Sequence, residues 1–359
     1  MGAQTAEAMW FWAITAFVFG ITIGSFLNVV IWRLPRNQSL MSPSHSYCPK
    51  CGKSLSALDL VPLFSFLALG RKCRQCKAPI SWRYFSVELL TGILFVLITL
   101  RFLPNVPDCV SLLLFACVMV PVFFIDLDTF TIPNSLNLLA FAIPVGRDIY
   151  GIVAKEPNHA LIGGWLPTSV LGGLVGALIF GVVRIAGWLW KQVEAMGLGD
   201  VLLGRGMGAM LVGFIPLAAS PLRLFPIWVI LSVSSGAIIG VAALLAQGKQ
   251  ESPPPPAPTP AGGGGEQEEE APSSFGQELF AVGFCLWLGD LWEYIGYYQG
   301  VLSGKIKPQT GLIEDDFVAG PTHIPFGPFM VLGFFLTVFI GEWLTSGYLR
   351  WAFPPAVRP

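Results

Sequence analysis

Long apolar runs constrain the fold of this chain more than any other feature of its sequence. A helix needs roughly 17–25 apolar residues to cross about 30 Å of hydrocarbon, because each residue adds about 1.5 Å. Charged residues make up only 12% of the chain, about half of the ~25% that is typical of soluble domains. The sequence therefore predicts an all-α polytopic membrane protein and excludes an ordinary soluble globule. The eight predicted membrane helices are 9–33, 85–103, 109–125, 134–150, 164–190, 204–221, 225–246 and 325–346.

The distribution of Lys and Arg predicts the orientation of these helices. Basic residues are concentrated in the segment from Arg33 to Arg83, whereas the short loop around Pro104–Pro107 has none. Cytoplasmic loops carry an excess of Lys and Arg, so we expect the first loop in the cytoplasm and the N-terminus outside. The first run lacks a basic n-region and a cleavage site, so we expect a retained membrane helix. Alternation of the helices then places 126–134 and 191–203 on the cytoplasmic side as well.

The first loop contains two CxxC pairs whose spacing is close to that of zinc sites. Four thiolates close a tetrahedral site without an open coordination position, so we expect a structural zinc in a zinc-ribbon-like loop. The alternative, two disulfides, is disfavoured in a reducing cytoplasmic loop. We interpret the other cysteines, Cys109, Cys117 and Cys285, as packing residues. The predicted zinc ligands are Cys48, Cys51, Cys73 and Cys76.

Acidic residues lie where two of the apolar runs meet the cytoplasmic boundary. The stretch FFIDLDTFTIPN (123–134) contains Asp126 and Asp128, and GLGD (197–200) contains Asp200. GxGD by itself is a weak pattern, since many Gly-Asp pairs are turns. Two acids at one membrane boundary favour a function, because ionisable groups at membrane depth are costly. Asp126 and Asp128 lie about 200° apart on a helix, so only one of them can face Asp200, and these residues alone do not decide which.

Two carboxylates that are brought together predict a specific chemistry. Like charges a few Å apart cannot both ionise, so the pair shares one proton. The ionised acid then serves as general base on a water molecule, and the protonated acid polarises a carbonyl. This arrangement is typical of an aspartyl protease.

The chain resembles the type IV prepilin peptidases, also called bifunctional prepilin leader peptidase/N-methyltransferases. The resemblance runs in order from residue 24 to about 246 and resumes at 321–345. The first acid of the family motif lies seven residues before the Pro of an IP element, which implies Asp126 (133 minus 7), and the second is the Asp of GxGD, Asp200. The matching stretches are GSFLNVVIWRLP (24–35), CPKC, CRQC, PISWRYFSVELLTG (79–92), IDLDTFTIPN, GLGD and HIPFGPFMVLG (323–333).

The resemblance implies an aspartyl endopeptidase in the bacterial cytoplasmic membrane, with its active site facing the cytoplasm. It would cut the basic leader from type IV prepilins or type II secretion pseudopilins and then N-methylate the new terminus with S-adenosylmethionine. Pro133, Gly197 and Gly199 would support the catalytic loops, and Glu88 is a candidate for the methyltransferase half. The implied partners are prepilin-like substrates and the lipid bilayer, with no nucleic acid.

Three features depart from the family pattern. The family usually has Lys two residues after the GxGD acid, where this chain has Leu202. No Gly-rich nucleotide fingerprint follows a predicted strand, so the methyltransferase half depends on the resemblance alone. The connection 247–320 is longer than usual.

The histidines, which show no metal-like spacing, are interpreted as surface or loop residues: His45, His159 and His323.

The composition predicts the domain organisation of the long connection. The Pro, Gly and Glu content of 247–275 indicates a disordered linker. The following apolar stretch, Leu279–Leu288, is too short to span, so we favour an interfacial or re-entrant helix over a membrane crossing at 279–299. The acids Glu314, Asp315 and Asp316 form a solvated face or a dock for basic leaders. The predicted domains are 1–35 (first helix), 36–83 (zinc loop), 84–246 (peptidase core), 247–275 (linker), 276–320 (insertion) and 321–359 (last helix and tail).

Two other classes of protein share parts of this pattern. A presenilin-like intramembrane GxGD protease has the same pair of acids, but its first acid is expected in a YD element, and Ile125 precedes Asp126 here. A membrane assembly factor that has lost catalysis would keep the zinc loop, and Leu202 is the best support for that alternative.

Overall fold

The computed structural model describes most of the predicted membrane core. Within the described residues there is no β-strand, only isolated bridges, so the predicted all-α class is confirmed. The predicted linker 247–275 and insertion 276–320 lie outside these residues, as do Cys285 and His323. The described residues are 3–41, 45–48, 50–157, 159–160, 166–191, 196–214, 224–246 and 325–352.

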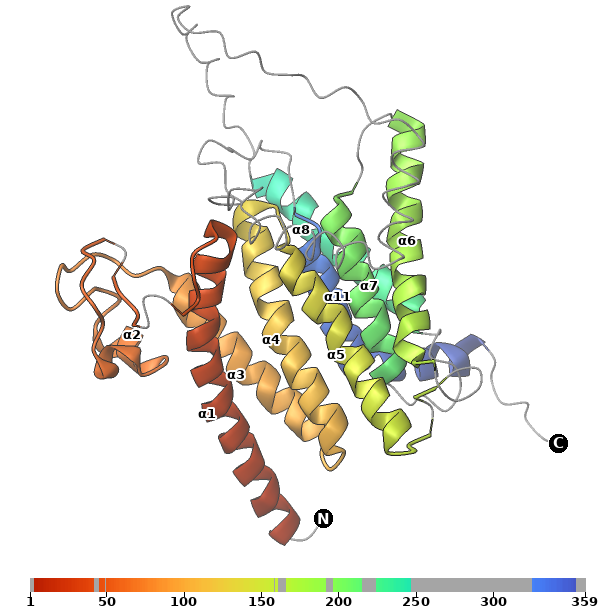
Figure 1. Ribbon diagram of the computed structural model, residues 1–359, viewed down its shortest axis with the longest axis horizontal. Helices are drawn as coiled ribbons and strands as arrows, with labels where there is room; N and C mark the ends of the chain where they lie inside the picture. The colour runs from red at the N-terminus through yellow and green to blue at the C-terminus, as the bar shows by residue number, and fades with distance from the viewer. Residues whose placement is uncertain are drawn as a thin grey trace, which may run out of the picture.

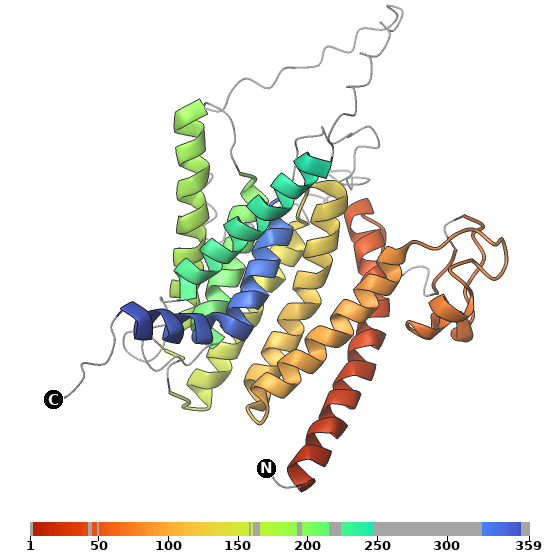
Figure 2. The same cartoon turned by 180° about the vertical axis from the view of Figure 1, so that it is seen from behind.

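In the described part of the chain, eight long helices form one bundle, and the four-cysteine loop projects from its side (Figure 1). The loop follows α1 and carries the short helices η1 (Leu34–Arg36), η2 (Ala57–Leu60) and α2 (Phe64–Ala68). The view from behind shows α8 and α11 crossing the face of the bundle formed by α4 and α7 (Figure 2). The long helices are α1 (Ala3–Arg33), α3 (Trp82–Phe102), α4 (Val106–Thr129), α5 (Asn134–Val153), α6 (Thr168–Lys191), α7 (Leu198–Phe214), α8 (Leu224–Ala246) and α11 (Gly327–Ala352).

Six of these helices are long and apolar enough to cross a membrane. They are α1, α3, α4, α5, α6 and α11, and each coincides with a span predicted from the sequence. The other two predicted spans correspond to α7, which has 17 residues, and to α8, whose apolar stretch is the shorter segment Leu224–Ile238. The sixth predicted span begins too late, at 204, because α7 begins at Leu198 and includes the acid of the GLGD motif.

Local sequence signals define the helix ends beside the predicted acids. Phe130 ends α4 in a left-handed conformation with φ 55°, and its N–H donates to the carbonyl of Asp126. Pro133 is the N-cap of α5, a position from which its fixed φ leads into a helix without loss of a hydrogen bond. The turn 130–133 therefore reverses the chain directly after the two acids of α4.

The backbones of α6 and α7 approach each other closely because four glycines line their contact. A Cβ atom at Gly172 would collide with the carbonyl oxygen of Gly208, and one at Gly176 with that of Gly204. Within each helix the two glycines are four residues apart, the small-xxx-small spacing that permits close packing of membrane helices. The sequence analysis overlooked this spacing, although it is visible in the glycines of both runs.

The close packing of α6 and α7 makes a methyl group at Gly176 destabilising. Gly176→Ala would press a Cβ onto the backbone of α7, and overpacking of this kind costs about 1–3 kcal/mol. Gly146→Ala is the matched control, because the Cβ site at Gly146 in α5 has no neighbour within 4 Å. We expect Gly176→Ala to lower the thermal unfolding midpoint of the purified protein in detergent and Gly146→Ala to leave it unchanged. Equal midpoints for the two variants would contradict this packing.

Candidate active site

Asp126 lies in the last turn of α4, at the end of an apolar helix. Its side chain is only 4% exposed, and its Oδ2 atom has no hydrogen-bond partner among the described residues. Gly327, the first residue of α11, faces this oxygen so closely that a Cβ at Gly327 would lie 2.5 Å from it. A buried carboxylate oxygen without a partner is costly in a purely structural role. The burial of this oxygen against Gly327 therefore points to a role beyond packing.

Asp200 lies in the first turn of α7 and is partly exposed. Its carboxylate is beside Gly197, where a Cβ would contact Oδ2 at 3.4 Å. The negative charge of the Asp200 carboxylate repels that of the Asp126 carboxylate. The structure thus brings together two acids that are far apart in the sequence and come from opposite ends of helices that run in opposite directions.

The turn after α4 packs between the segments that carry the two acids. The Ile132 side chain lies 3.4 Å from the Cβ position of Gly199 and 3.3 Å from that of Gly327. Asn137, one turn into α5, donates from Nδ2 to the carbonyl of Gly199 at 3.3 Å. The IP element, the GLGD motif and the start of α11 therefore meet at one point of the bundle, around the two carboxylates.

Asp128 faces a different neighbour from Asp126. Its carboxylate forms an ion pair with Arg83 in the first turn of α3. Residues two positions apart on a helix point about 200° away from each other, so Asp126 and Asp128 face opposite sides of the end of α4. The sequence alone does not decide which of the two acids faces Asp200, and in the structure it is Asp126.

The residues after the GLGD motif lie inside the bundle. Leu202, at the position where the family usually has Lys, is only 4% exposed and belongs to the main hydrophobic core. Arg205 is 1% exposed, and its guanidinium lies over the ring of Phe141 with 4.6 Å to the centroid. Leu202 is therefore a packing residue in this chain, and no cation occupies its position beside Asp200.

The four cysteines of the first loop form a compact cluster. Their sulfur atoms all lie within 4.8 Å of one another, and Cys48 Sγ is 3.9 Å from Cys76 Sγ. Four sulfurs bonded to one zinc at about 2.3 Å would lie about 3.8 Å apart, whereas a disulfide bond is only about 2.05 Å long. The cluster therefore has the size of a tetrahedral metal site, and all four cysteines are free.

The two CxxC pairs have the same backbone design. The carbonyls of Cys48 and Cys73 each accept the N–H of the residue four positions on. That residue has positive φ in both pairs, 68° at Gly52 and 59° at Lys77. Backbone N–H groups of Cys76 and Gln75 donate to the Cys73 sulfur and lower its pKa to about 7, whereas burial and the neighbouring sulfurs raise the pKa of Cys76 to about 11. The matching turns bring the sulfurs of both pairs into one cluster.

Glu88 lies on α3 beneath the four-cysteine loop. It is 9% exposed and its Oε2 accepts the N–H of Leu63 at 2.8 Å. Leu63 is held at φ 61°, a strained conformation for a residue with a side chain. Glu88 therefore holds the loop segment around α2 against α3. Among the described residues, neither Asp126 nor Asp200 interacts with Glu88.

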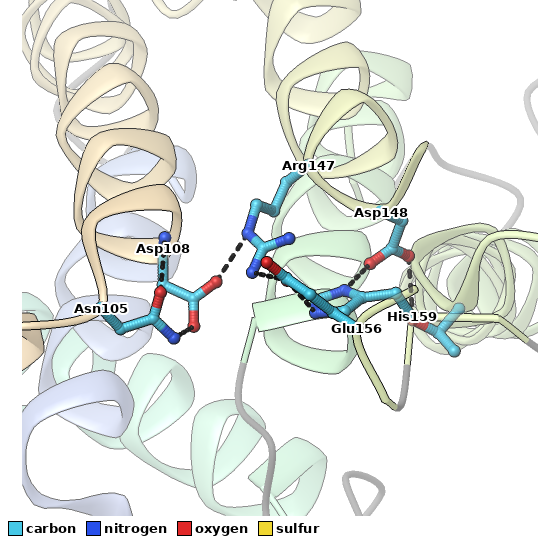
Figure 3. Close-up of polar contacts among 7 residues, drawn as sticks. Asn105, Asp108, Arg147, Asp148, Glu156 and His159 are labelled. Atoms are coloured by element: carbon cyan, nitrogen blue, oxygen red, sulfur yellow. Dashed lines mark hydrogen bonds and ion pairs between the residues drawn. The ribbon is translucent and has the colours of Figure 1, made fainter. Parts of the chain in front are cut away.

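A second group of charged side chains lies at the opposite end of the bundle, where α4 begins and α5 ends (Figure 3). Arg147 pairs with Asp108 at 2.7 Å and with Glu156 at 2.6 Å. His159 pairs with the fully buried Asp148 at 2.8 Å. His159 thus lies in a loop, as predicted, but its side chain is only 11% exposed. Ionisable residues inside the apolar run 134–150 were the signal that could have revealed this network.

Two family models and several known proteins match this chain in sequence. Residues 18–102 match the family described as "Bacterial Peptidase A24 N-terminal domain", and residues 113–241 match the "Type IV leader peptidase family". The chain is 32% identical over 339 residues to the "Prepilin leader peptidase/N-methyltransferase" of Myxococcus xanthus, which covers 93% of this chain and 91% of that protein. The protein of the same name from Aeromonas salmonicida is 34% identical, covering 68% of this chain and 85% of that protein. We found no solved structure that matches this chain significantly.

The cysteine cluster predicts that the purified protein carries one metal ion. Cys48→Ser and Cys73→Ser each replace a buried member of the cluster and should lower the metal content to well below one ion per chain, since a structural site needs all four thiolates. Cys117→Ser is the control, because Cys117 lies in α4 outside the cluster. Elemental analysis of the purified variants measures the difference. A full metal complement in both loop variants would contradict the site.

Proposed function

This chain belongs to the type IV prepilin leader peptidase/N-methyltransferase family, and we propose that Asp126 and Asp200 together cleave the leader from prepilin-like substrates. The observation that supports this proposal most is the approach of the two acids, each from the end of a different helix, with a buried carboxylate oxygen that no described residue binds. The chain is a multi-pass membrane protein of a bacterial family, and its two acids lie in the terminal turns of α4 and α7.

The two acids would act as a pair that shares one proton. Repulsion between neighbouring carboxylates disfavours the doubly ionised state, so one acid is protonated and the other is not. The ionised acid takes a proton from a water molecule, whose oxygen attacks the carbonyl carbon of the scissile peptide bond. The protonated acid donates a hydrogen bond to the carbonyl oxygen, and a proton then passes to the departing amine. The buried Oδ2 of Asp126, which has no hydrogen-bond partner among the described residues, would contact the attacking water.

The position of the acids suits a substrate that is half in the membrane. The helix ends that lead into the basic first loop lie on the same side of the bundle as Asp126 and Asp200. The positive-inside rule places this side in the cytoplasm. A prepilin or pseudopilin would present its basic leader there, with its apolar helix in the bilayer. Its scissile bond would then lie at the boundary where the two acids meet, in the bacterial cytoplasmic membrane.

We also infer that the cysteine cluster holds a zinc ion with a structural role. All four positions of a tetrahedral site are taken by thiolates, so no position remains open for a water molecule or a substrate. The ion would stiffen the loop 45–80, whose described residues contain only short helices and isolated bridges.

The second proposed activity is methylation of the amine that cleavage creates. The name of the Myxococcus xanthus relative includes N-methyltransferase, and such a reaction needs a methyl donor, which we propose to be S-adenosylmethionine. The amine does not exist before the peptide bond is cut, so cleavage must precede methylation. Residues of the first loop and of α3 are the candidates for this half of the protein.

The proposed pair predicts a specific pattern of activity among Asp→Asn variants. Asp126→Asn and Asp200→Asn each remove one member of the acid–base pair and should reduce cleavage at least ~100-fold. Asp128→Asn removes only an ion pair on the other side of α4 and should cleave at close to the wild-type rate. The assay uses detergent-solubilised protein and a peptide with a basic leader, Gly-Phe and an apolar helix. Loss of cleavage in Asp128→Asn alone would contradict the assignment, and an inactive wild type would favour an assembly factor.

The contact between Gly327 and Asp126 predicts the effect of a single methyl group. A Cβ at Gly327 would lie 2.5 Å from Asp126 Oδ2 and would displace the carboxylate from its place beside Asp200. Misplacement of a reacting group by about 1 Å costs up to ~100-fold in rate, so we expect Gly327→Ala to lower kcat for leader cleavage at least tenfold. Gly146→Ala serves again as the control for an added methyl group. Wild-type kcat in Gly327→Ala would show that this glycine does not set the carboxylate position.

A further inference from the structure

A patch of exposed apolar side chains lies on the four-cysteine loop. On the short helix α2, Phe64 is 69% exposed and Leu67 is 61% exposed. Helix η2 contacts α2, and residues 58–61 in and after η2 expose three more apolar side chains. Exposed apolar groups that gather beside polar ones mark a site that contacts a membrane or another protein. The apolar patch consists of Leu58, Leu60, Val61, Phe64 and Leu67.

The contact between α2 and the start of α3 sets the depth of this patch in the membrane. Phe66, the buried residue of α2, packs against Trp82 and Phe85 with ring centroids 5.2 Å and 5.3 Å apart. Trp82 is the first residue of α3, which is long and apolar enough to cross the membrane. Its side chain is half-exposed, and Trp is enriched at the interface between membrane and water. Helix α2 therefore lies at the depth where α3 enters the bilayer.

The loop that carries the apolar patch extends sideways from the bundle. Both views show it at the edge of the bundle beside α1, whereas α7, which carries Asp200, lies on the other side of α4 (Figures 1 and 2). A segment that leaves a membrane bundle sideways at the depth of a helix end lies over the surrounding lipid. The apolar patch is thus close to the bilayer surface and away from the two acids.

The charge of the loop suits an anionic surface. From Cys48 to Arg83 the sequence contains a single acid, Asp59, and its carboxylate pairs with Arg74 at 2.7 Å. The guanidinium of Arg71 lies 4.8 Å from the centroid of the Trp82 ring, so a cation is held at the depth of that Trp. Basic segments next to a membrane helix are attracted to anionic lipid headgroups. The exposed basic side chains of the loop are Lys50, Lys53, Arg71, Lys72, Arg74 and Lys77.

We propose that the apolar patch docks the four-cysteine loop onto a bilayer surface that contains anionic lipids. The apolar side chains enter the boundary between headgroups and acyl chains, and the basic side chains meet the phosphates above it. The same combination of apolar and basic residues binds interfacial segments of other proteins to membranes. The docking holds the metal-binding loop at a fixed height beside the ends of α1 and α3, and it uses neither Asp126 nor Asp200.

The test measures hydrogen exchange of the full-length protein in three surroundings. One sample is in amphipol without a bilayer, one in phosphatidylcholine nanodiscs, and one in nanodiscs of phosphatidylcholine mixed with phosphatidylglycerol, with a single chain per disc. We expect amides of 57–69 to exchange at least about threefold more slowly in the mixed discs than in amphipol, with the neutral discs between them. High salt should reduce the difference between the two kinds of disc, because it screens the attraction. Equal exchange in all three surroundings would overturn the proposal.

The apolar contribution is tested with the double variant Phe64→Ser/Leu67→Ser. Both side chains are exposed, so the variant should keep its metal and exchange like the wild type in amphipol. In the mixed discs it should lose the slow exchange of 57–69. Met41→Ser is the matched control, since Met41 is an 83% exposed apolar residue of the same loop outside η2 and α2. Slow exchange that persists in the double variant would contradict docking through the apolar patch.

The basic contribution is tested with the double variant Arg71→Gln/Lys72→Gln. We expect it to exchange at 57–69 equally fast in neutral and mixed discs, because the attraction to anionic headgroups is lost. Lys155→Gln is the control, since Lys155 is an exposed cation at the opposite end of the bundle, directly after α5. A difference between the discs as large as that of the wild type would remove these two cations from the surface.

Crosslinking identifies what contacts the apolar patch. A photoreactive benzoylphenylalanine in place of Phe64 should form adducts with phospholipid in the mixed discs. Adducts with an added prepilin-like peptide and none with lipid would overturn the proposal and make the patch a substrate dock. Leader cleavage is assayed in parallel, so that a failure of docking is distinguished from a failure of the proposed peptidase site.

Discussion

The direct contact between the backbones of α6 and α7 determines where the GLGD acid can lie. Lipid tails are as apolar as the side chains of these helices, so membrane helices associate through close packing and not through the hydrophobic effect. Glycines on both helices let the two backbones meet directly, Gly172 against Gly208 and Gly176 against Gly204. Helix α7 is also packed against α5, α8 and α11, so it is the centre of the bundle. The packing of α7 therefore fixes the position of Asp200, which lies in its first turn.

The free-energy cost of placing charge in hydrocarbon explains why the two acids lie at helix ends. Asp126 and Asp200 both occupy terminal turns, where the chain leaves the apolar part of the bundle. Gly327 lies against the Asp126 carboxylate, and Ile132 of the following turn packs against the Cβ positions of both Gly199 and Gly327. Leu202 continues this pattern, because it adds apolar packing where the family usually has Lys.

The charged network at the opposite end of the bundle has a structural effect on the same helices. Arg147, Asp108 and Glu156 are paired, and so are His159 and Asp148, with Thr168 and the Ser169 N–H completing the bonds of Asp148. Breaking one partner of a buried pair leaves an uncompensated charge. The network therefore ties the starts of α4 and α6 to the end of α5. Both ends of α4 and α5 are held, one by ion pairs and the other by the turn at Pro133.

Local features of the sequence determine the helices and the four-cysteine cluster of this protein. Apolar runs predict the helices because length and composition alone decide whether a segment suits a bilayer, and two CxxC pairs predict the sulfur cluster because each pair is built by its own turn. The sequence does not decide between Asp126 and Asp128, nor does it show that Gly172 and Gly176 meet Gly208 and Gly204, or that Glu88 holds Leu63. Each of these depends on the rotation of one helix against a distant one. Side-chain packing across the whole bundle sets that rotation, and so only the tertiary structure decides which acid faces Asp200.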